Sequence, residues 1–190
     1  MKTPMKWKTM VVGMLGIGLF GMGKAWAVTN TPADATITVT PLANVSLAIS
    51  PTTYAYGPLS VNTSSITASA LTLSNNGDVD VKVSKQISNQ SNPNGAGSWV
   101  ADTTQGTDHY VLSVATSTAR PVSAEFTAAT QLGAVSTPSN LTGSAATQPV
   151  ITVAGGALPS VDLWFKLDMP TKVSSQIGRE ITVTFTGTAQ

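Results

Sequence analysis

The chain of 190 residues has no cysteine, a single histidine and few charged residues, which make up 10% of the sequence. Without cysteine, disulfide bonds cannot stabilise the fold, and a thioether-linked lipid anchor is excluded. A zinc site normally needs about three or four His, Cys or acidic ligands, and this chain lacks the supply. The sequence therefore predicts no metal and no cofactor, and stability must come from packing and backbone hydrogen bonds.

The first 27 residues have the pattern of an export signal. Lysines at positions 2, 6 and 8 precede an uncharged apolar run, Met10 to Met22, and Ala25-Trp26-Ala27 fits a small-residue cleavage site. The run is shorter than the ~20 residues that a helix needs to span a bilayer. We therefore expect a signal peptide over residues 1–27, an exported mature chain of residues 28–190, and no retained membrane span.

Charge in the mature chain differs from that of the whole sequence. Four of the ten Lys and Arg residues lie in the leader, so residues 28–190 hold six basic against nine acidic residues, a net charge of −3. A mildly acidic domain has no basic footprint for nucleic acid or anionic lipid. We therefore expect no nucleic-acid partner, and instead protein partners or self-association at the cell surface, with a glycan as a further candidate.

The composition predicts an all-β fold. Residues 28–190 contain 26 Thr and 20 Ser, whereas Lys and Glu, the usual surface residues of helices, are scarce. Thr and Val favour strands, and Ser, Asn, Gly and Pro favour turns. Period-two alternation predicts strands over 36–40, 45–49, 66–74, 79–87, 109–115, 124–127, 150–153, 162–169 and 180–187. Many short strands without helical segments indicate an antiparallel β-sandwich. We expect one such domain over residues 28–190, with an N-terminal extension at 28–44 and a long loop at 131–149.

The most legible stretch is ALTLSNNGDVDVKV, residues 70–83. Leu71 and Leu73, and then Val79, Val81 and Val83, occupy alternate positions, so each strand has one buried and one solvated face. The intervening Asn-Asn-Gly tolerates the positive φ of a tight reversal. Neighbouring aspartates at 78 and 80 lack the loop pattern of a calcium site. The stretch therefore predicts a corner of the sheet rather than a functional turn.

Residues 45–85 resemble the opening strands of Hydin-type and choice-of-anchor immunoglobulin-like domains of bacteria. The resemblance is carried by Ile49-Ser50-Pro51, Tyr54-Ala55-Tyr56-Gly57, Val61, Leu71-Thr72-Leu73 and Asn75-Asn76-Gly77-Asp78. This sequence departs from the pattern at Asn62, where such domains usually carry glycine. The resemblance implies an immunoglobulin-like sandwich that serves as a structural or interaction module, and it carries over no catalytic residue.

The C-terminal region contains two further alternating segments. Leu163, Phe165 and Leu167 share one face of the first, and Ile181, Val183 and Phe185 share one face of the second. We expect these two strands to form a hairpin joined by residues 171–179. Trp164 falls on the outward side of its strand.

Few residues suit a ligand site or catalysis. Trp99, in a Gly- and Ser-rich loop, and the outward Trp164 are candidate ligand-binding residues, because exposed tryptophans stack on sugars; packing against a neighbouring loop or sheet edge is the alternative. His109 lies beside Asp108 and near Asp102 in the sequence, but no G-x-S-x-G motif accompanies it. We therefore expect no enzymatic activity.

Thr36–Thr40 is predicted to be an added strand, with Ile37 and Val39 on one face and threonines on the other. It can close the edge of its own sandwich, which a short connection favours. Alternatively it can pair with the next subunit, where Ile37 and Val39 would fill a groove and propagate a filament.

The function expected from these patterns is that of a non-enzymatic structural or interaction protein, exported to the bacterial periplasm, cell surface or extracellular matrix. A carbohydrate-binding module is the first alternative and a secreted hydrolase the second.

Overall fold

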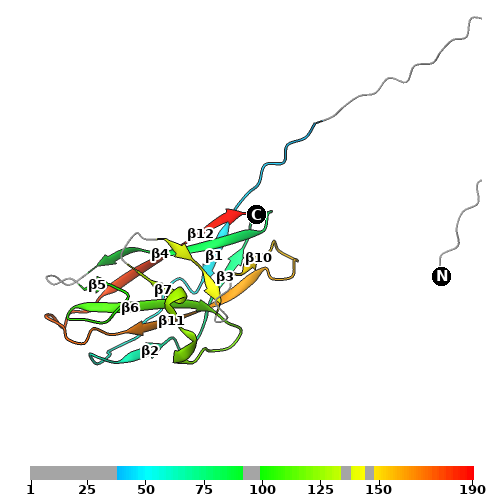
Figure 1. Ribbon diagram of the computed structural model, residues 1–190. Helices are drawn as coiled ribbons and strands as arrows, with labels where there is room; N and C mark the ends of the chain where they lie inside the picture. Colours follow the sequence, from blue (N-terminus) through cyan, green and yellow to red (C-terminus); the bar gives the residue numbers. More distant parts are fainter. Residues whose placement is uncertain (1–37, 92–98, 134–137, 144–147) are drawn as a thin grey trace, which may run out of the picture. The chain divides into compact units, whose positions relative to one another are not determined.

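The computed structural model describes residues 38–91, 99–133, 138–143 and 148–190 (Figure 1). Pro41–Gln190 form one structural unit, which contains every helix and strand described below. Residues 38–40 form no helix or strand, so the strand predicted at 36–40 is wrong over the residues that are described. The predicted signal peptide, residues 1–27, and the first part of the N-terminal extension, up to Ile37, lie outside the described residues.

Two β-sheets make up this unit. The larger has eight strands: β1 (Leu47–Ser50), β2 (Ser64–Ile66), β3 (Leu71–Asn75), β5 (Val100–Ala101), β6 (His109–Thr116), β7 (Gln131–Leu132), β9 (Thr142–Gly143) and β11 (Ser160–Asp168). The smaller has four: β4 (Val81–Ser91), β8 (Ser139–Asn140), β10 (Val150–Ile151) and β12 (Glu180–Ala189). Pairing is antiparallel except where β5 and β9 run parallel to β6.

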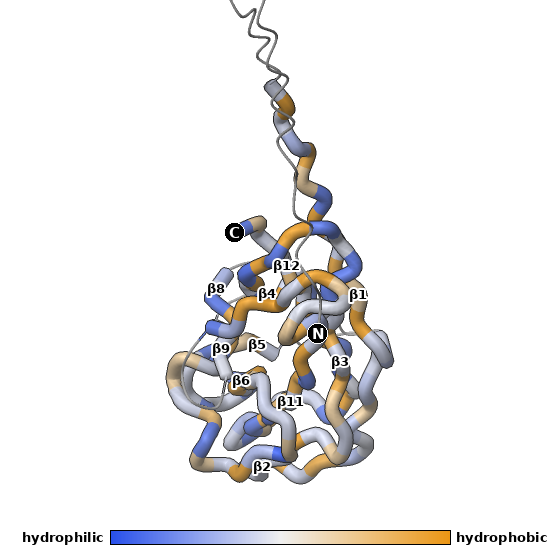
Figure 2. Tube along the Cα trace, turned by 90° about the vertical axis from the view of Figure 1, so that its right-hand side faces the viewer, coloured by the Kyte–Doolittle hydropathy of each residue, from blue (hydrophilic) through white to orange (hydrophobic). Residues whose placement is uncertain are grey.

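The core lies between these sheets and follows from the alternation in the sequence. Leu163, Phe165 and Leu167 of β11 are buried against Val83 and Ile87 of β4 in one cluster. Apolar and polar stretches alternate along the strands in Figure 2. The prediction of an all-β, immunoglobulin-like antiparallel β-sandwich is confirmed.

The Asn75-Asn76-Gly77 turn joins the two sheets, because β3 belongs to the larger sheet and β4 to the smaller. The buried Asn75 side chain donates to the carbonyls of Val79 (2.8 Å) and Ile151 (3.2 Å) and accepts from the Gly77 amide (2.9 Å). A Cβ on Gly77 would lie 2.2 Å from the carbonyl oxygen of Asn44, so only glycine fits. The positive φ predicted for this turn is wrong, because Asn75, Asn76 and Gly77 all have negative or extended φ, and glycine is required at 77 by the close approach of Asn44.

The hairpin predicted from β11 and β12 is wrong. β11 pairs with β3, β6 and β2 in the larger sheet, whereas β12 pairs with β4 in the smaller. Their inward faces meet across the core, where the rings of Phe165 and Phe185 lie edge to face at 6.4 Å. Two amphipathic strands that are neighbours in sequence can bury their apolar faces either as a hairpin in one sheet or by packing across the core from two sheets. The alternation of apolar residues is the same in both arrangements, so it does not predict which one forms.

Three other sequence predictions need correction. The strand predicted at 124–127 is replaced by the 3-10 helix η1 (Ser123–Glu125), which is followed by η2 (Ala128–Thr130). The strand predicted at 66–74 is divided, with β2 and β3 in different parts of the larger sheet. The long loop predicted at 131–149 contains β7, β8 and β9, because Leu132 and Leu141 are fully buried and hold it on the core.

Asn62, where the sequence departs from the resembling domains, has a φ of 57°. This left-handed conformation favours glycine and is tolerated by asparagine. Tyr54 and Tyr56 nearby pack edge to face, with ring centroids 5.1 Å apart. They cover the core beside β2.

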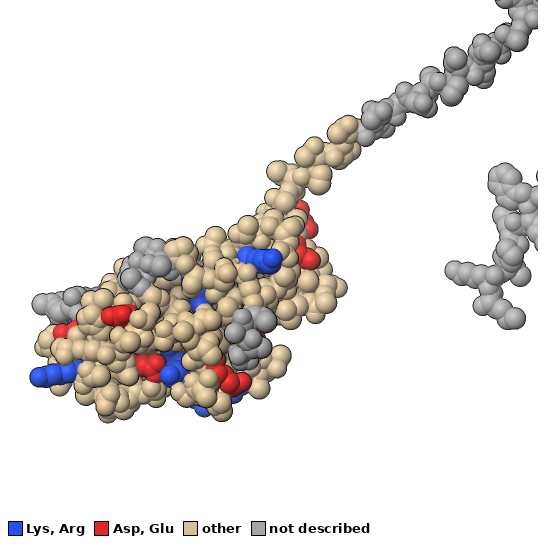
Figure 3. All heavy atoms as spheres, viewed as in Figure 1, with Lys and Arg blue, Asp and Glu red and all other residues tan. Residues whose placement is uncertain are grey.

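The visible surface in Figure 3 is mostly uncharged, with Lys, Arg, Asp and Glu scattered over it. No helix in the part of the chain that the structure describes is long and apolar enough to cross a membrane.

Candidate functional site

The candidate site is the seam between β1 and β12, which are end strands of the two sheets (Figure 1). At one end the seam is closed. A Cβ on Gly187 of β12 would lie 2.9 Å from Val45 Cγ1 and 3.3 Å from Leu47 Cδ1. Glycine at this position therefore lets the two strands come into contact there.

Beyond this contact the strands part and leave an apolar groove of about 230 Å³. The lining residues come from both strands and from the core beneath: Leu47, Ala48, Ile49, Leu73, Val183, Thr184 and Phe185. None of them is charged. A cavity of about 150 Å³ lined by similar side chains can hold a benzene molecule, so this groove is wide enough for aliphatic side chains.

The inward residues of β12 show that the core is incompletely covered here. Ile181, Val183 and Phe185 point inward, as predicted, yet all three are only half-buried. On the neighbouring strand β4, by contrast, Val83 and Ile87 have no exposed surface. The inward side chains of the smaller sheet are therefore fully covered on β4 and partly exposed to solvent on β12.

The backbone of β12 is also available. Its ten residues pair with β4 on one side, and no strand of the described ranges pairs with the other side. An unpaired strand edge presents N–H and C=O groups that can pair with a further strand. Because β1 is only four residues long, it covers part of the seam and leaves the rest open.

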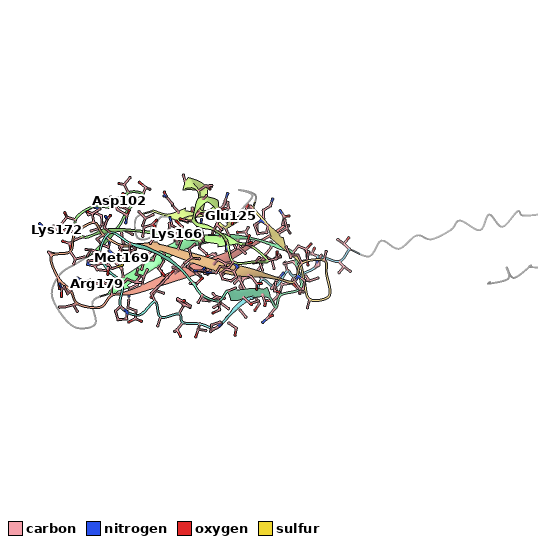
Figure 4. The ribbon with its side chains drawn as sticks, turned by 90° about the horizontal axis from the view of Figure 1, so that it is seen from below. Asp102, Glu125, Lys166, Met169, Lys172 and Arg179 are labelled. Carbon is pink, nitrogen blue, oxygen red and sulfur yellow. The ribbon has the colours of Figure 1, made fainter. Side chains whose placement is uncertain are left out.

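Trp99 is half-buried rather than free to stack on a ligand. Its ring lies 6.3 Å from that of Tyr110, and the guanidinium of Arg179 lies over it at 5.6 Å. Figure 4 places Arg179 at the same end of the sandwich as Asp102, Met169 and Lys172. Trp99 therefore helps to cover one end of the core.

Trp164 lies on the outer face of the larger sheet, as predicted, but it is 8% exposed and cannot serve there as an open stacking platform. Its indole N–H donates to the carbonyl of Ser117 at 2.9 Å. From the same segment, Arg120 donates to the carbonyls of Thr67 and Ile66, both at 2.9 Å. These bonds hold the segment after β6 across the outer face and bury Trp164. The two tryptophans lie on opposite faces of the larger sheet and form no common site.

His109 and Asp102 form a pair, with Nδ1 and Oδ2 2.9 Å apart and both side chains about 40% exposed. The bond to His109, aided by the Thr103 amide, lowers the pKa of Asp102. Ser174 donates its hydroxyl to Asp108 at 2.6 Å, and this bond lowers the pKa of Asp108. Within the described ranges, no serine hydroxyl bonds to His109, so a Ser-His-Asp arrangement is not assembled.

Lys85 is a buried cation that the sequence analysis did not single out. It has no exposed surface, and its Nζ donates to the carbonyl of Ala129 at 3.2 Å. Burial lowers its pKa to about 8. Its position alternates with Val81, Val83 and Ile87, and this inward register could have revealed it. No carboxylate of the described residues pairs with Lys85, so burying its charge lowers the stability of the fold. Lys85 does not line the groove.

The assembly residues Ile37 and Val39 are not brought to a site. Ile37 lies outside the described residues, and Val39, which is described, is 80% exposed and in no strand. No group of three His, Cys, Asp or Glu side chains that could hold a metal occurs among the residues that are described. The groove between β1 and β12 was not visible in the sequence, because it depends on which strands end each sheet.

Comparison of the chain with protein-family models, with curated proteins and with solved structures found no significant match.

Proposed function

We propose that this protein is a non-enzymatic structural or interaction protein that binds an extended polypeptide strand in the groove between β1 and β12. The observation that carries the proposal is the coincidence of two features at one place: an unpaired ten-residue strand edge and an apolar groove beside it. In strand addition, main-chain hydrogen bonds give affinity and pockets for alternate side chains give specificity. This seam offers both.

The setting we propose is outside the cytoplasm of a bacterium, in the periplasm, at the cell surface or in the extracellular matrix. The signal-like leader of residues 1–27 supports export, and the absence of cysteine is compatible with a fold held by packing alone. The scattered surface charges in Figure 3 suit association through neutral strand edges rather than through charged patches.

A fluorophore on β12, beside the groove, tests strand binding. Thr184→Cys gives a single attachment point on the outer face of β12, where the Thr184 hydroxyl donates to Ser88 at 2.7 Å, because the chain has no cysteine. A synthetic peptide of alternating Thr and Val should change the emission of a polarity-sensitive dye at this position in a saturable way. The matched control carries the same dye at Thr103, an exposed loop residue, and should show no change. Equal responses at both positions, or none at either, would refute strand binding in the groove.

Glycan binding through Trp99 and Trp164 is the alternative that the sequence predicts, and the half-buried Trp99 ring and the buried Trp164 ring do not favour it. A glycan array separates the two proposals. The wild-type protein is expected to bind no glycan, whereas binding that is lost in Trp99→Ala would favour the carbohydrate-binding alternative.

A further inference from the structure

This inference rests on the proposed function and identifies the strand that the groove binds. We propose that the strand bound in the groove between β1 and β12 is Thr36–Thr40 of a second copy of this chain. Each copy would then donate its N-terminal segment to a neighbour and accept a segment from another.

The side-chain spacing of the segment matches that of the groove. Ile37 and Val39 are two residues apart, and in an extended strand such residues share one face about 6.6 Å apart. The groove walls have the same period: Leu47 and Ile49 on β1, and Val183 and Phe185 on β12. Two apolar side chains of an inserted strand can therefore meet two layers of apolar side chains.

The other face of the segment also fits. Thr36, Thr38 and Thr40 would point outward, as Thr182 and Thr186 of β12 already do. Neither the segment nor the groove lining contains a charge, so insertion leaves no buried ion unpaired. The segment has high β-propensity and no Pro or Gly, which is typical of sequences that pair with strand edges.

Insertion into the groove of the same copy is opposed by the anchoring of the chain just before β1. The Asn44 amide donates to Asp78 Oδ1 at 2.6 Å, and the Asp78 amide donates back to the carbonyl of Asn44 at 3.0 Å. Only Pro41, Leu42 and Ala43 remain between Thr40 and this anchor to reverse the chain direction. The reversed strand would also have to pass between Val45 and Gly187, which close that end of the seam.

Donation to a second copy meets neither obstacle. Because the donor segment and the acceptor groove are different surfaces, the contact is heterologous, and repeated contacts of this kind propagate a ring or a filament. Since the contact contains no ion pair, the assembly should be insensitive to salt.

Light scattering on the full chain in its exported form gives the first test. The wild-type mass should rise with concentration to at least about twofold that of the monomer. Ile37→Asp should abolish this rise, because it places a charge in the apolar groove. The matched control, Thr38→Asp, puts the same charge on the outward face of the same segment and should still assemble. A monomeric wild type at every concentration, or equal loss in both variants, would overturn the inference.

A disulfide trap identifies the two surfaces. One copy carries Thr38→Cys and the other Thr184→Cys, in a chain with no other cysteine. Paired strands bring opposite Cα atoms to about 4.5–5.5 Å, which is within disulfide range. The mixture should form a covalent heterodimer under mild oxidation. A control mixture, in which the acceptor carries Thr103→Cys in place of Thr184→Cys, should form none. Equal trapping at both acceptor positions would overturn the inference.

Peptide binding to the chain labelled on β12 separates this inference from the function on which it rests. The acceptor is the full chain with Ile37→Asp, Val39→Asp and the dye at Thr184→Cys, so it cannot donate its own segment. A peptide of residues 35–41 should bind at least about tenfold more tightly than a Thr-Val peptide of unrelated sequence, a difference of about 1.4 kcal/mol. If only the unrelated peptide binds, strand binding stands and the self-partner fails; if neither binds, both proposals fail.

Discussion

Replacing Lys85 by methionine should stabilise the protein at neutral pH. Lys85 is fully buried, and among the described residues its amine bonds only to the carbonyl of Ala129. Methionine keeps an apolar stem of similar length and removes the charge. The Ala129 carbonyl is not left without a donor, because the Thr142 hydroxyl also bonds to it at 3.0 Å.

The size of the effect follows from the pKa of Lys85, which burial lowers from 10.5 to about 8. Each pKa unit corresponds to about 1.4 kcal/mol, so the buried charge costs about 3–4 kcal/mol below pH 8. Between pH 8 and 10.5 the unfolded chain holds the proton that the folded chain has lost, so the wild-type free energy of unfolding rises with pH across this window. The variant should lack that rise.

Urea unfolding between pH 7 and pH 9.5 measures both effects. Lys85→Met should be more stable than the wild type at pH 7, and the two should converge toward pH 9.5. The control Lys82→Met lies on the same strand but is exposed, and it should change stability little at either pH. If Lys85→Met destabilises the protein at pH 7, or keeps the wild-type pH dependence, the reasoning about the buried amine is wrong.

Two pairs of substitutions test the packing. The Tyr56 hydroxyl is buried and has no hydrogen-bond partner among the described residues, so Tyr56→Phe should leave thermal stability unchanged or raise it. Tyr54→Phe removes the hydroxyl that accepts a hydrogen bond from the Ala68 amide at 2.8 Å, so it should lower stability by about 1 kcal/mol. In chemical denaturation, Phe165→Ala should cost about 3–5 kcal/mol, and Phe185→Ala less, because Phe185 borders the open seam and is half-buried. Equal losses within either pair would contradict these assignments.

Alternation in the sequence was enough to predict the sandwich and most of its inward residues. Leu163, Phe165 and Leu167 are buried as expected, because the period of two fixes which face each side chain takes. The partner of each strand was not predictable in this way. β11 and β12 have the pattern of a hairpin, yet they lie in different sheets.

The candidate site was less accessible to sequence reasoning. The prediction that Trp164 lies on the outer face is confirmed. Its burial depends on Ser117 and Arg120, which lie in a segment across that face that has no regular alternation of apolar and polar residues, so the sequence did not reveal it. The groove depends on β1 and β12 being end strands, which is a property of topology. The sequence did indicate a strand, Thr36–Thr40, that could use such a groove, but not where the groove is.

Hydrogen–deuterium exchange of β12 tests most directly whether the seam binds a strand. The peptide of residues 35–41, added to the full chain with Ile37→Asp and Val39→Asp, should slow exchange over Ile181–Phe185, because the outer edge amides gain hydrogen-bond partners. Exchange in β6, which lies inside the larger sheet, should not change. Unchanged exchange in β12 at a saturating peptide concentration would contradict the account.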